Sequence, residues 1–265
     1  MTVLTLLEKP PERLDLSGIT PAALAGMSEA EIARLPVGTT RYRLTLGDCF
    51  GIAVGEPGRV LVRGGSSRLD RVGAKLAAGT MVVEGDVGQR LGEGMTDGSL
   101  EVHGSAGPFA GTGAAGGRIT IDGDAGPSAG GTLHGAKAGL NGATLIIKGR
   151  AGDRLGDTMR SGLILVGAAG DHAGCRAVAG TIVAGAVGAY PGYGMRRGTL
   201  LARECGPLLP TFVHTGRQAL VITRILRRLL EQFAPDMGVV LSGPLDRWAG
   251  DLATLGRGEI LMPAG

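Results

Sequence analysis

The chain has 265 residues, of which 43% are apolar and only 3% aromatic, and its formal net charge is +3. No apolar run is long enough to cross a bilayer, and the N-terminus lacks the basic start and cleavage site of a signal peptide, so we expect a cytoplasmic protein without a membrane segment. So small a charge, without aromatic residues interleaved among the basic ones, argues against a nucleic-acid partner. The cysteines, Cys49, Cys175 and Cys205, are too far apart in sequence to indicate a disulfide framework or a metal-binding motif.

Residues 1–45 are predicted to form an N-terminal segment with short helices. Thr20 and Pro21 are of the types preferred at the N-cap and at the first position of a helix. Ser28 and Glu31 have the spacing of a capping box, in which each side chain bonds to the backbone N–H of the other residue. Pro36 is expected to end the second helix, because proline has no N–H with which to continue it.

A glycine pattern, Gly-x-x-Gly-x-x-x-Gly, dominates residues 46–212, where it recurs six times. Its leading glycines are separated by 19, 19, 26, 18 and 18 residues. A repeat this short cannot bury an apolar face by itself, so its copies are expected to stack. The glycines of the pattern are Gly85, Gly88, Gly92, Gly104, Gly107, Gly111, Gly123, Gly126, Gly130, Gly149, Gly152, Gly156, Gly167, Gly170, Gly174, Gly185, Gly188 and Gly192.

Apolar residues also stand at fixed distances from each leading glycine, in columns typical of ladders between stacked parallel strands. The column two residues after the leading glycine contains Val87, Ala106, Ala125, Ala151, Ala169 and Val187. The column two residues before it contains Val83, Val102, Ile121, Ile147, Leu165 and Val183. The column ten residues after it contains Met95, Ala114, Leu133, Met159, Ala177 and Met195.

These patterns predict an all-β chain whose residues 46–212 form a right-handed parallel β-helix of glycine-patterned coils, with short helices at the ends. The right hand is expected because nearly all crossovers between parallel strands have it. Alanine and glycine suit a narrow interior, which larger residues would overpack. The longer spacing between Gly123 and Gly149 predicts a surface loop over residues 134–141.

Residues 213–265 are predicted to form a C-terminal helix and tail. The helix is expected over Arg217–Phe233 and is ended by Pro235. Its apolar face is expected to contain Leu220, Val221, Ile225, Leu229 and Phe233. Such a helix can cap the open end of the stack, whose strand edges would otherwise invite aggregation.

Few residues are candidates for metal or nucleotide chemistry. No phosphate-binding lysine follows any copy of the glycine pattern, and a dinucleotide fingerprint occurs once in a fold instead of six times. We expect no metal site, because metal-ligand spacing is absent among the histidines, which are His103, His134, His172 and His214.

Asp153 and Asp171 share a column one coil apart and are the best candidates for a catalytic carboxylate pair. They leave open a stand-alone β-helix enzyme acting on an acidic polymer or a sugar. Trp248 is the only tryptophan that could stack against a sugar, which argues against this alternative. Two solvated residues at coil corners are the favoured explanation of the pair, so no catalytic residue is assigned.

The coils resemble those of a known family. The segment from Val83 to Gly98 resembles the repeat of the C subunit of formylmethanofuran dehydrogenases, which are oxidoreductases, and of their bacterial variant, the formyltransferase/hydrolase complex. The residues from Leu16 to Pro36 and from Arg247 to Leu261 also look like that subunit. The repeat is similar as well to the C-terminal domain of the large subunit of glutamate synthase.

The resemblance implies a noncatalytic scaffold subunit of a one-carbon complex that transfers formyl between tetrahydromethanopterin and methylofuran or methanofuran and hydrolyses or oxidises it. It implies a formyltransferase subunit and an amidohydrolase-like subunit as partners. No cofactor is expected on this chain, since the furan carrier and the metals belong to the partner subunits. Only four of the 27 basic residues are lysines, which favours the bacterial variant.

The furan carriers of this family have glutamate-rich tails, which raises a hypothesis about the basic residues. Arginines on neighbouring coils could guide such a tail by charge attraction. The candidates are Arg154, Arg160, Arg176, Arg196 and Arg197. An ordinary solvated surface or a contact with a partner subunit is the favoured alternative.

Overall fold

The computed structural model describes residues 1–219, 221–233 and 243–263, and within them the chain is mostly β. Thirteen strands form one sheet in the order β13-β14-β15-β12-β11-β10-β9-β8-β7-β6-β4-β1-β3, and β2 pairs with β5 in a second, small sheet. The large sheet is open, with β13 and β3 as its edges. The strands are β1 (Thr2–Leu6), β2 (Leu14–Asp15), β3 (Phe50–Ala53), β4 (Arg59–Arg63), β5 (Leu69–Asp70), β6 (Thr80–Glu84), β7 (Ser99–Val102), β8 (Arg118–Ile121), β9 (Asn141–Ala151), β10 (Ser161–Ala169), β11 (Thr181–Val187), β12 (Arg197–Cys205), β13 (Val213–Gln218), β14 (Leu245–Gly250) and β15 (Arg257–Pro263).

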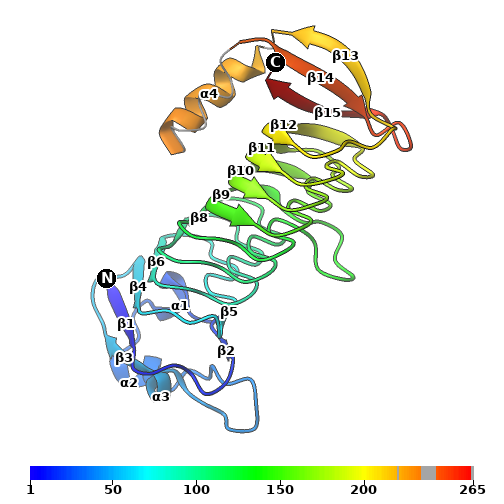
Figure 1. The fold of residues 1–265 in the computed structure, drawn as a ribbon. Helices are drawn as coiled ribbons and strands as arrows, with labels where there is room; N and C mark the ends of the chain where they lie inside the picture. Colours follow the sequence, from blue (N-terminus) through cyan, green and yellow to red (C-terminus); the bar gives the residue numbers. More distant parts are fainter. Residues whose placement is uncertain (220, 234–242, 264–265) are drawn as a thin grey trace.

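The strands of the glycine-patterned region stack in chain order. β4 pairs in parallel with β6, and from β6 to β12 each strand pairs in parallel with the next one along the chain. The chain therefore returns to the same side of the molecule before each new strand, which gives an elongated stack (Figure 1). The expectation of an all-β chain whose repeats stack through parallel strands is confirmed.

The column predicted two residues after each leading glycine forms a second ladder, through isolated bridges in the earlier coils and through the last residues of β9, β10 and β11 in the later ones. It joins, in order, Val87, Ala106, Ala125, Ala151, Ala169 and Val187. All six side chains are buried in the same apolar core as the inward residues of the main strands. The interior is therefore enclosed by two ladders, and the small residues of this column limit its width.

Two residues of another predicted column lie on the opposite face of the sheet. Ile147 pairs with Val166 and not with Leu165, because Lys148 and Gly149 together oppose the single residue Gly167. This bulge shortens the later coils by one residue. The prediction that Leu165 and Val183 point inward was wrong: both belong to a separate apolar cluster on the outer face of the sheet.

The insertion in the third coil displaces one further predicted core residue. Leu133 is partly exposed, and Leu140, which is fully buried, occupies its expected place. The backbone shows this register, since Asn141 N donates to Ala114 O at 2.7 Å and Arg160 N donates to Leu140 O at 2.9 Å. The predicted surface loop is confirmed in its first half: residues 134–137 are exposed and the loop projects from the stack, whereas Leu140 is buried and Asn141 begins β9 (Figure 1).

Glycine is needed at the positions of the pattern for two different physical reasons. Gly92 has φ +62°, a left-handed conformation that residues with a Cβ seldom adopt. Gly107 has an ordinary φ, but a Cβ there would lie 2.7 Å from the carbonyl carbon of Gly88, one coil away. The third glycine of each copy thus permits a turn, whereas the first two permit close approach between coils.

The N-terminal segment contains the predicted helices, α1 (Pro21–Leu24) and α2 (Glu29–Ala33). The side chain of Thr20 accepts a hydrogen bond from Ala23 N, and Ser28 and Glu31 form the predicted capping box. The sequence did not indicate α3 (Leu46–Cys49), nor β1, which enters the large sheet between β3 and β4. β1 has only five residues, too few for its alternating burial to be recognised.

The prediction of the C-terminal helix was wrong in where the helix begins and in which of its faces is buried. Val213–Gln218 forms β13, and the helix α4 (Ile222–Phe233) begins after it. Val221 and Ile225 are 76% and 58% exposed, whereas Leu226 and Leu230 are buried. Residues 220 and 235 and the side chains of residues 229 and 233 lie outside the described part of the chain.

The helix α4 covers the outer face of the sheet and not its end. Leu226 and Leu230 pack against the outward apolar residues of β9 to β12, among them Leu165 and Val183. The end of the stack is formed by the tail: β15 pairs in parallel with β12, and β14 and β13 follow as antiparallel neighbours (Figure 1). The tail strands therefore cover the strand edge that the helix was expected to cover.

Candidate functional site

Asp153 and Asp171 lie one coil apart, as predicted, but their carboxylates serve the backbone. Asp153 Oδ1 accepts a hydrogen bond from Asp171 N at 2.9 Å, and Asp171 Oδ1 accepts one from Ala189 N at 2.8 Å. Each carboxylate thus points to the coil that follows it in the chain, and not toward a common point. This geometry favours a structural role over a catalytic pair.

The same bond recurs along the stack and involves the glycines of the pattern. Asp86 Oδ1 accepts from Ser105 N at 2.8 Å, and Asp124 Oδ1 accepts from Arg150 N at 2.7 Å. A Cβ at Gly170 would overlap Asp153 Oδ1. The absent side chain of the glycine therefore makes room for a carboxylate that satisfies a backbone N–H of the neighbouring coil.

Cys175 lies beside an ion pair whose carboxylate is buried. Arg176 donates Nε to Asp157 Oδ1 at 2.8 Å and Nη2 to Asp157 Oδ2, and Asp157 is only 4% exposed. Burial, together with the charge of Asp157, raises the pKa of the Cys175 thiol to about 12. Burial also raises the pKa of Cys205 to about 11. Both thiols are protonated at neutral pH, which suits neither nucleophilic attack nor metal binding.

The histidines lie apart from one another. His103 faces solvent, and its Nδ1 lies 2.7 Å from Asp122 Oδ2, while Lys148 Nζ lies 2.5 Å from Asp122 Oδ1. His214 packs against Trp248 with ring centroids 5.0 Å apart, and His134 is exposed in the loop. Within residues 1–219, 221–233 and 243–263, no group of three His, Cys, Asp or Glu side chains is placed to hold a metal ion.

The five arginines of the guidance hypothesis have different surroundings. Arg176 is held by Asp157, while Arg154, Arg160 and Arg196 are exposed. Arg197 is also exposed and stands directly opposite Arg257 in the parallel ladder between β12 and β15. Like charges placed opposite each other repel, so an anion bound at this position would be stabilised.

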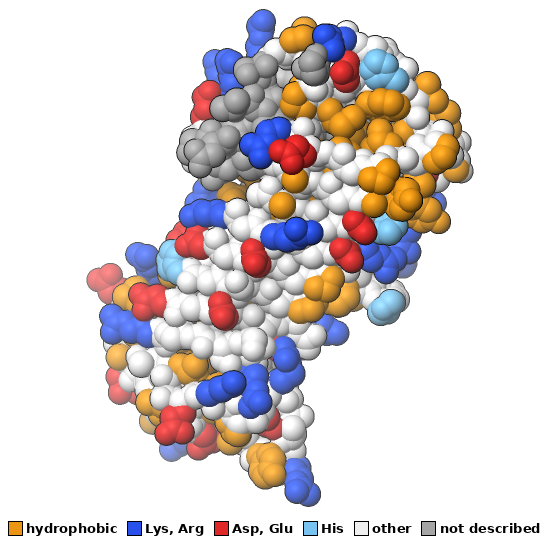
Figure 2. Space-filling view, viewed as in Figure 1, with side chains coloured by type: hydrophobic (Ala, Val, Ile, Leu, Met, Phe, Trp, Pro, Cys, Tyr) orange, Lys and Arg blue, Asp and Glu red, His pale blue; other side chains and the backbone are white. Residues whose placement is uncertain are grey.

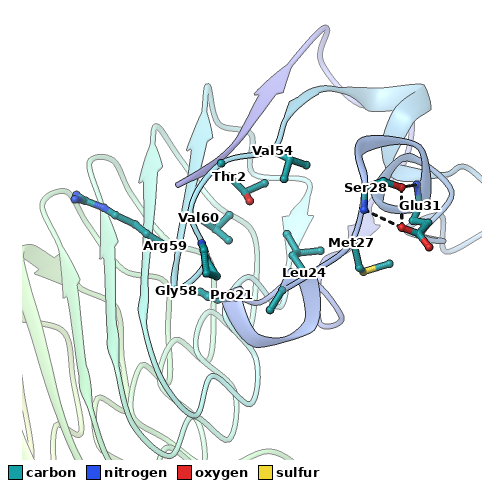
Figure 3. A pocket seen from close by; sticks show the side chains of 14 residues that line it. Thr2, Pro21, Leu24, Met27, Ser28, Glu31, Val54, Gly58, Arg59 and Val60 are labelled. Carbon is teal, nitrogen blue, oxygen red and sulfur yellow. Dashed lines mark hydrogen bonds between the residues drawn. The ribbon is translucent and has the colours of Figure 1, made fainter.

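A first hollow, of about 500 Å³, lies at the N-terminal end between α1, α2 and β4. Figure 3 shows Pro21, Leu24, Val54 and Val60 around it, so its lining is largely apolar. Glu31 lies next to Ser28, and its carboxylate accepts hydrogen bonds from the backbone N–H and the hydroxyl of Ser28 (Figure 3). Such a hollow can accept an apolar group, but it offers no group for acid–base chemistry.

A second hollow, of about 380 Å³, lies near the C-terminal end of the stack. Its lining consists of Asp153, Arg154, His172, Cys175, Arg176 and Tyr193. The His172 ring lies 6.0 Å from Tyr190 and 6.2 Å from Tyr193, measured between centroids. A carboxylate, two guanidinium groups, an imidazole, a thiol and a phenol meet here. Because Asp153 accepts a hydrogen bond from Asp171 N, Arg176 is held by Asp157 and the Cys175 thiol is protonated, the arrangement suits binding better than proton transfer.

Sequence reasoning did not identify this second hollow. It considered His172 only as a possible metal ligand and did not connect it with Arg176 or Tyr193 of the same and the next coil. A signal was present in Tyr190-Pro-Gly-Tyr193, a pair of aromatic residues in a chain that is only 3% aromatic.

The fold and these surfaces define a class of all-β proteins built from stacked glycine-patterned coils. The repeated glycines and aspartates maintain the stack, and the polar side chains of its surface are suited to binding. No family model matches the chain. It is 59% identical, over the whole of both chains, to the C subunit of the formyltransferase/hydrolase complex Fhc of Methylorubrum extorquens. The chain belongs to the family of that subunit.

A solved structure gives the same result. The X-ray crystal structure of the formyltransferase/hydrolase complex FhcABCD from Methylorubrum extorquens, in complex with methylofuran, contains a chain that matches with a TM-score of 0.97 and 58% identity. The match covers 99% of this chain and 100% of the other. None of the described helices is long and apolar enough to span a membrane.

Proposed function

We propose that this chain is a noncatalytic scaffold subunit of a formyltransferase/hydrolase complex. Such a complex passes a formyl group from tetrahydromethanopterin to methylofuran and hydrolyses it to formate. A formyltransferase subunit and an amidohydrolase-like subunit carry out the chemistry, and the carrier and the metals are bound there. The observation that supports this most strongly is the full-length identity of 59% with the C subunit of such a complex.

The side chains favour a scaffold over an enzyme of the β-helix type. The best carboxylate pair, Asp153 and Asp171, is engaged with the backbone of the following coil. The buried thiol of Cys175, with a pKa of about 12, is protonated at neutral pH. A rigid stack offers broad preformed surfaces, which bind partners with little loss of conformational entropy.

We also infer that the stacked coils form a right-handed parallel β-helix. The parallel pairing of successive strands and the second ladder from Val87 to Val187 support this geometry. The core that both ladders enclose, lined by residues such as Leu100 and Leu145, supports it as well. The right hand is the one that crossovers between parallel strands adopt.

Co-purification tests the assembly. The tagged chain is co-expressed with the formyltransferase subunit, the amidohydrolase-like subunit and the remaining subunit of the complex, and the eluate is analysed by native mass spectrometry. We expect one assembly that contains the chain together with its partners. Elution of the chain alone, with the partners folded and present in the lysate, would contradict the proposal.

We propose that the exposed arginines near the C-terminal end of the stack, Arg196 and Arg197, guide the acidic tail of the carrier. The support is the pairing of Arg197 with Arg257 and the exposure of Arg196 beside them. The variant Arg196→Glu, Arg197→Glu is expected to raise the carrier KM several-fold at low salt and less at high salt, because salt screens exposed charges. Arg41→Glu, Arg43→Glu at the other end is the control; an unchanged KM in the first variant contradicts guidance.

A further inference from the structure

We propose that the C-terminal end of the stack is a docking surface for another subunit of the complex, which presents an acidic side chain flanked by apolar ones. This surface, called the apex surface below, consists of Tyr190, Tyr193, Val213, Leu252 and Leu255 together with the hollow beside Arg154. The inference rests on the proposed function, because the occupant is a partner within the same complex.

The apolar residues of the apex surface are strongly exposed. They come from different segments of the chain that are joined by hydrogen bonds. Tyr193 is 53%, Val213 49%, Leu252 57% and Leu255 56% exposed. Figure 2 shows hydrophobic side chains gathered over this end of the molecule. Contiguous exposed apolar area of this kind is typical of protein–protein contacts.

Hydrogen bonds hold the loop of residues 251–256 next to the coil that carries Tyr193. Gly194 N donates to Asp251 Oδ2 at 3.1 Å, and Thr254 Oγ1 donates to Met195 O at 2.6 Å. Leu252 N donates to Thr211 O at 3.1 Å, close to Val213. The surface is therefore preformed, so that a partner can bind it without ordering a loop.

The adjoining hollow indicates the charge of the partner. Of the charged groups that line it, Asp153 already accepts a hydrogen bond from Asp171 N, and the guanidinium of Arg176 is already held by buried Asp157. Arg154 lies beside the Cys175 thiol, and among the described residues no carboxylate is within ion-pair distance of it. An incoming carboxylate would give Arg154 a charge-assisted hydrogen bond, which is among the stronger polar contacts in proteins.

The composition of the apex surface fits a binding hot spot. Tyrosine and arginine are the residues most often found at the energetic centre of interfaces. Two of the three tyrosines of the chain lie here, on neighbouring positions around His172. Tyr193 lines the hollow together with Arg154, and its ring would shield the ion pair from water once the partner is bound.

The test uses the co-expressed complex with matched variants at the two ends of the stack. Tyr193→Asp, Leu252→Asp and Arg154→Glu change the apex surface. Tyr42→Asp and Leu7→Asp are controls, because both residues are also exposed, 69% and 60%, but belong to the N-terminal segment. Thermal unfolding of each purified chain establishes that the variants are folded.

We expect the apex variants to weaken binding of at least one partner subunit by at least about tenfold, with the controls unchanged. If the wild-type chain assembles and the apex variants assemble equally well, the inference is wrong while the proposed function stands. If the apex surface instead mediates a dimer of this chain alone, the inference is overturned as well. Failure of the wild-type chain to assemble contradicts the proposed function itself.

Discussion

At the scale of single residues, the glycines of the repeat are determined by what lies one coil away. A side chain at Gly170 or Gly188 would collide with a carboxylate of the neighbouring coil, and one at Gly107 would collide with backbone. The aspartates in turn accept hydrogen bonds from backbone N–H groups that are not bonded within the sheet. Glycine and aspartate thus form one structural unit, repeated along the stack.

This close packing predicts the effect of adding a single methyl group. Gly107→Ala places a Cβ 2.7 Å from the carbonyl carbon of Gly88 and 2.9 Å from Gln89 N, so we expect a loss of roughly 1–3 kcal/mol in the free energy of unfolding. Gly18→Ala is the control, since no atom lies within 4 Å of its added Cβ. Urea unfolding measures both; equal stability of the two variants would show that the coils are not in the contact described.

Sequence reasoning succeeded where one residue sufficed to predict local structure. The capping box of Ser28 and Glu31 and the small inward residues such as Ala125 needed no knowledge of the rest of the fold. The bulge at Lys148 and Gly149 was not predictable, because it depends on which residue of the next coil they oppose. Counting across it placed Leu165 on the wrong face.

At the scale of elements, α4 shows how tertiary contacts decide between two apolar faces. Its sequence has apolar residues on more than one side, and nothing in that pattern favours Ile225 or Leu226 as the buried residue. The outward cluster on β9 to β12 provides the surface against which Leu226 and Leu230 pack. Because of the bulge, Leu165 and Val183, which stand two residues before their glycines, belong to that cluster and not to the ladder of Ile147.

The two faces of α4 can be told apart by truncation. Leu230→Ala removes a fully buried side chain and is expected to destabilise the protein by roughly 2–5 kcal/mol. Ile225→Ala removes an exposed side chain from the adjacent face and is expected to change the stability by less than about 0.5 kcal/mol. Chemical denaturation distinguishes the two, and the opposite order would assign the buried face to Ile225.

The N-terminal segment is attached to the first coils through Arg71, which links two carboxylates. Arg71 Nη1 donates to Asp15 Oδ2 at 2.8 Å and Nε donates to Glu93 Oε2 at 2.9 Å. Burial alone would raise the pKa of Asp15, but hydrogen bonds from Ser17 and the charge of Arg71 outweigh it and lower that pKa. Asp15 is therefore more stable as a carboxylate in the folded than in the unfolded chain.

This lowered pKa predicts an acid-dependent stability. The contribution of the carboxylate is fully present above the unfolded pKa of about 4 and is lost as the pH falls through the lower folded value. Asp15→Asn is expected to cost about 1 kcal/mol or less near neutral pH, since the pair is partly exposed, and less as the pH falls toward about 3. Urea unfolding at several pH values measures the difference; a difference independent of pH would contradict this origin.

At the scale of the whole molecule, one apolar core runs the length of the stack, from Leu4 of β1 to Ile260 of β15. The parallel stacking and most of the core columns could be predicted from the repeat itself. The closing strands could not: β1 and β15 contain no copy of the glycine pattern, and their places depend on pairing with β4 and β12. The apex surface was missed for the same reason, since its residues come from different coils and the tail.

A rigid stack that holds two catalytic subunits would act through effective concentration, by keeping the carrier close to both active sites. The chain is therefore expected to have no formyl transfer or hydrolysis activity of its own. Its contribution is expected in the coupled reaction only, because the proposed function assigns the active sites to the partner subunits.

The most direct test compares the reconstituted complex with and without this chain. Formate production from formyl-tetrahydromethanopterin measures the coupled reaction, and the two half-reactions are measured separately as controls. We predict that omission of the chain lowers the coupled rate at least about tenfold while both half-reactions persist, and that the isolated chain does not turn over formyl-methylofuran. An unchanged coupled rate without the chain, or turnover by the isolated chain that Asp153→Asn or Asp171→Asn abolishes, would contradict the scaffold role.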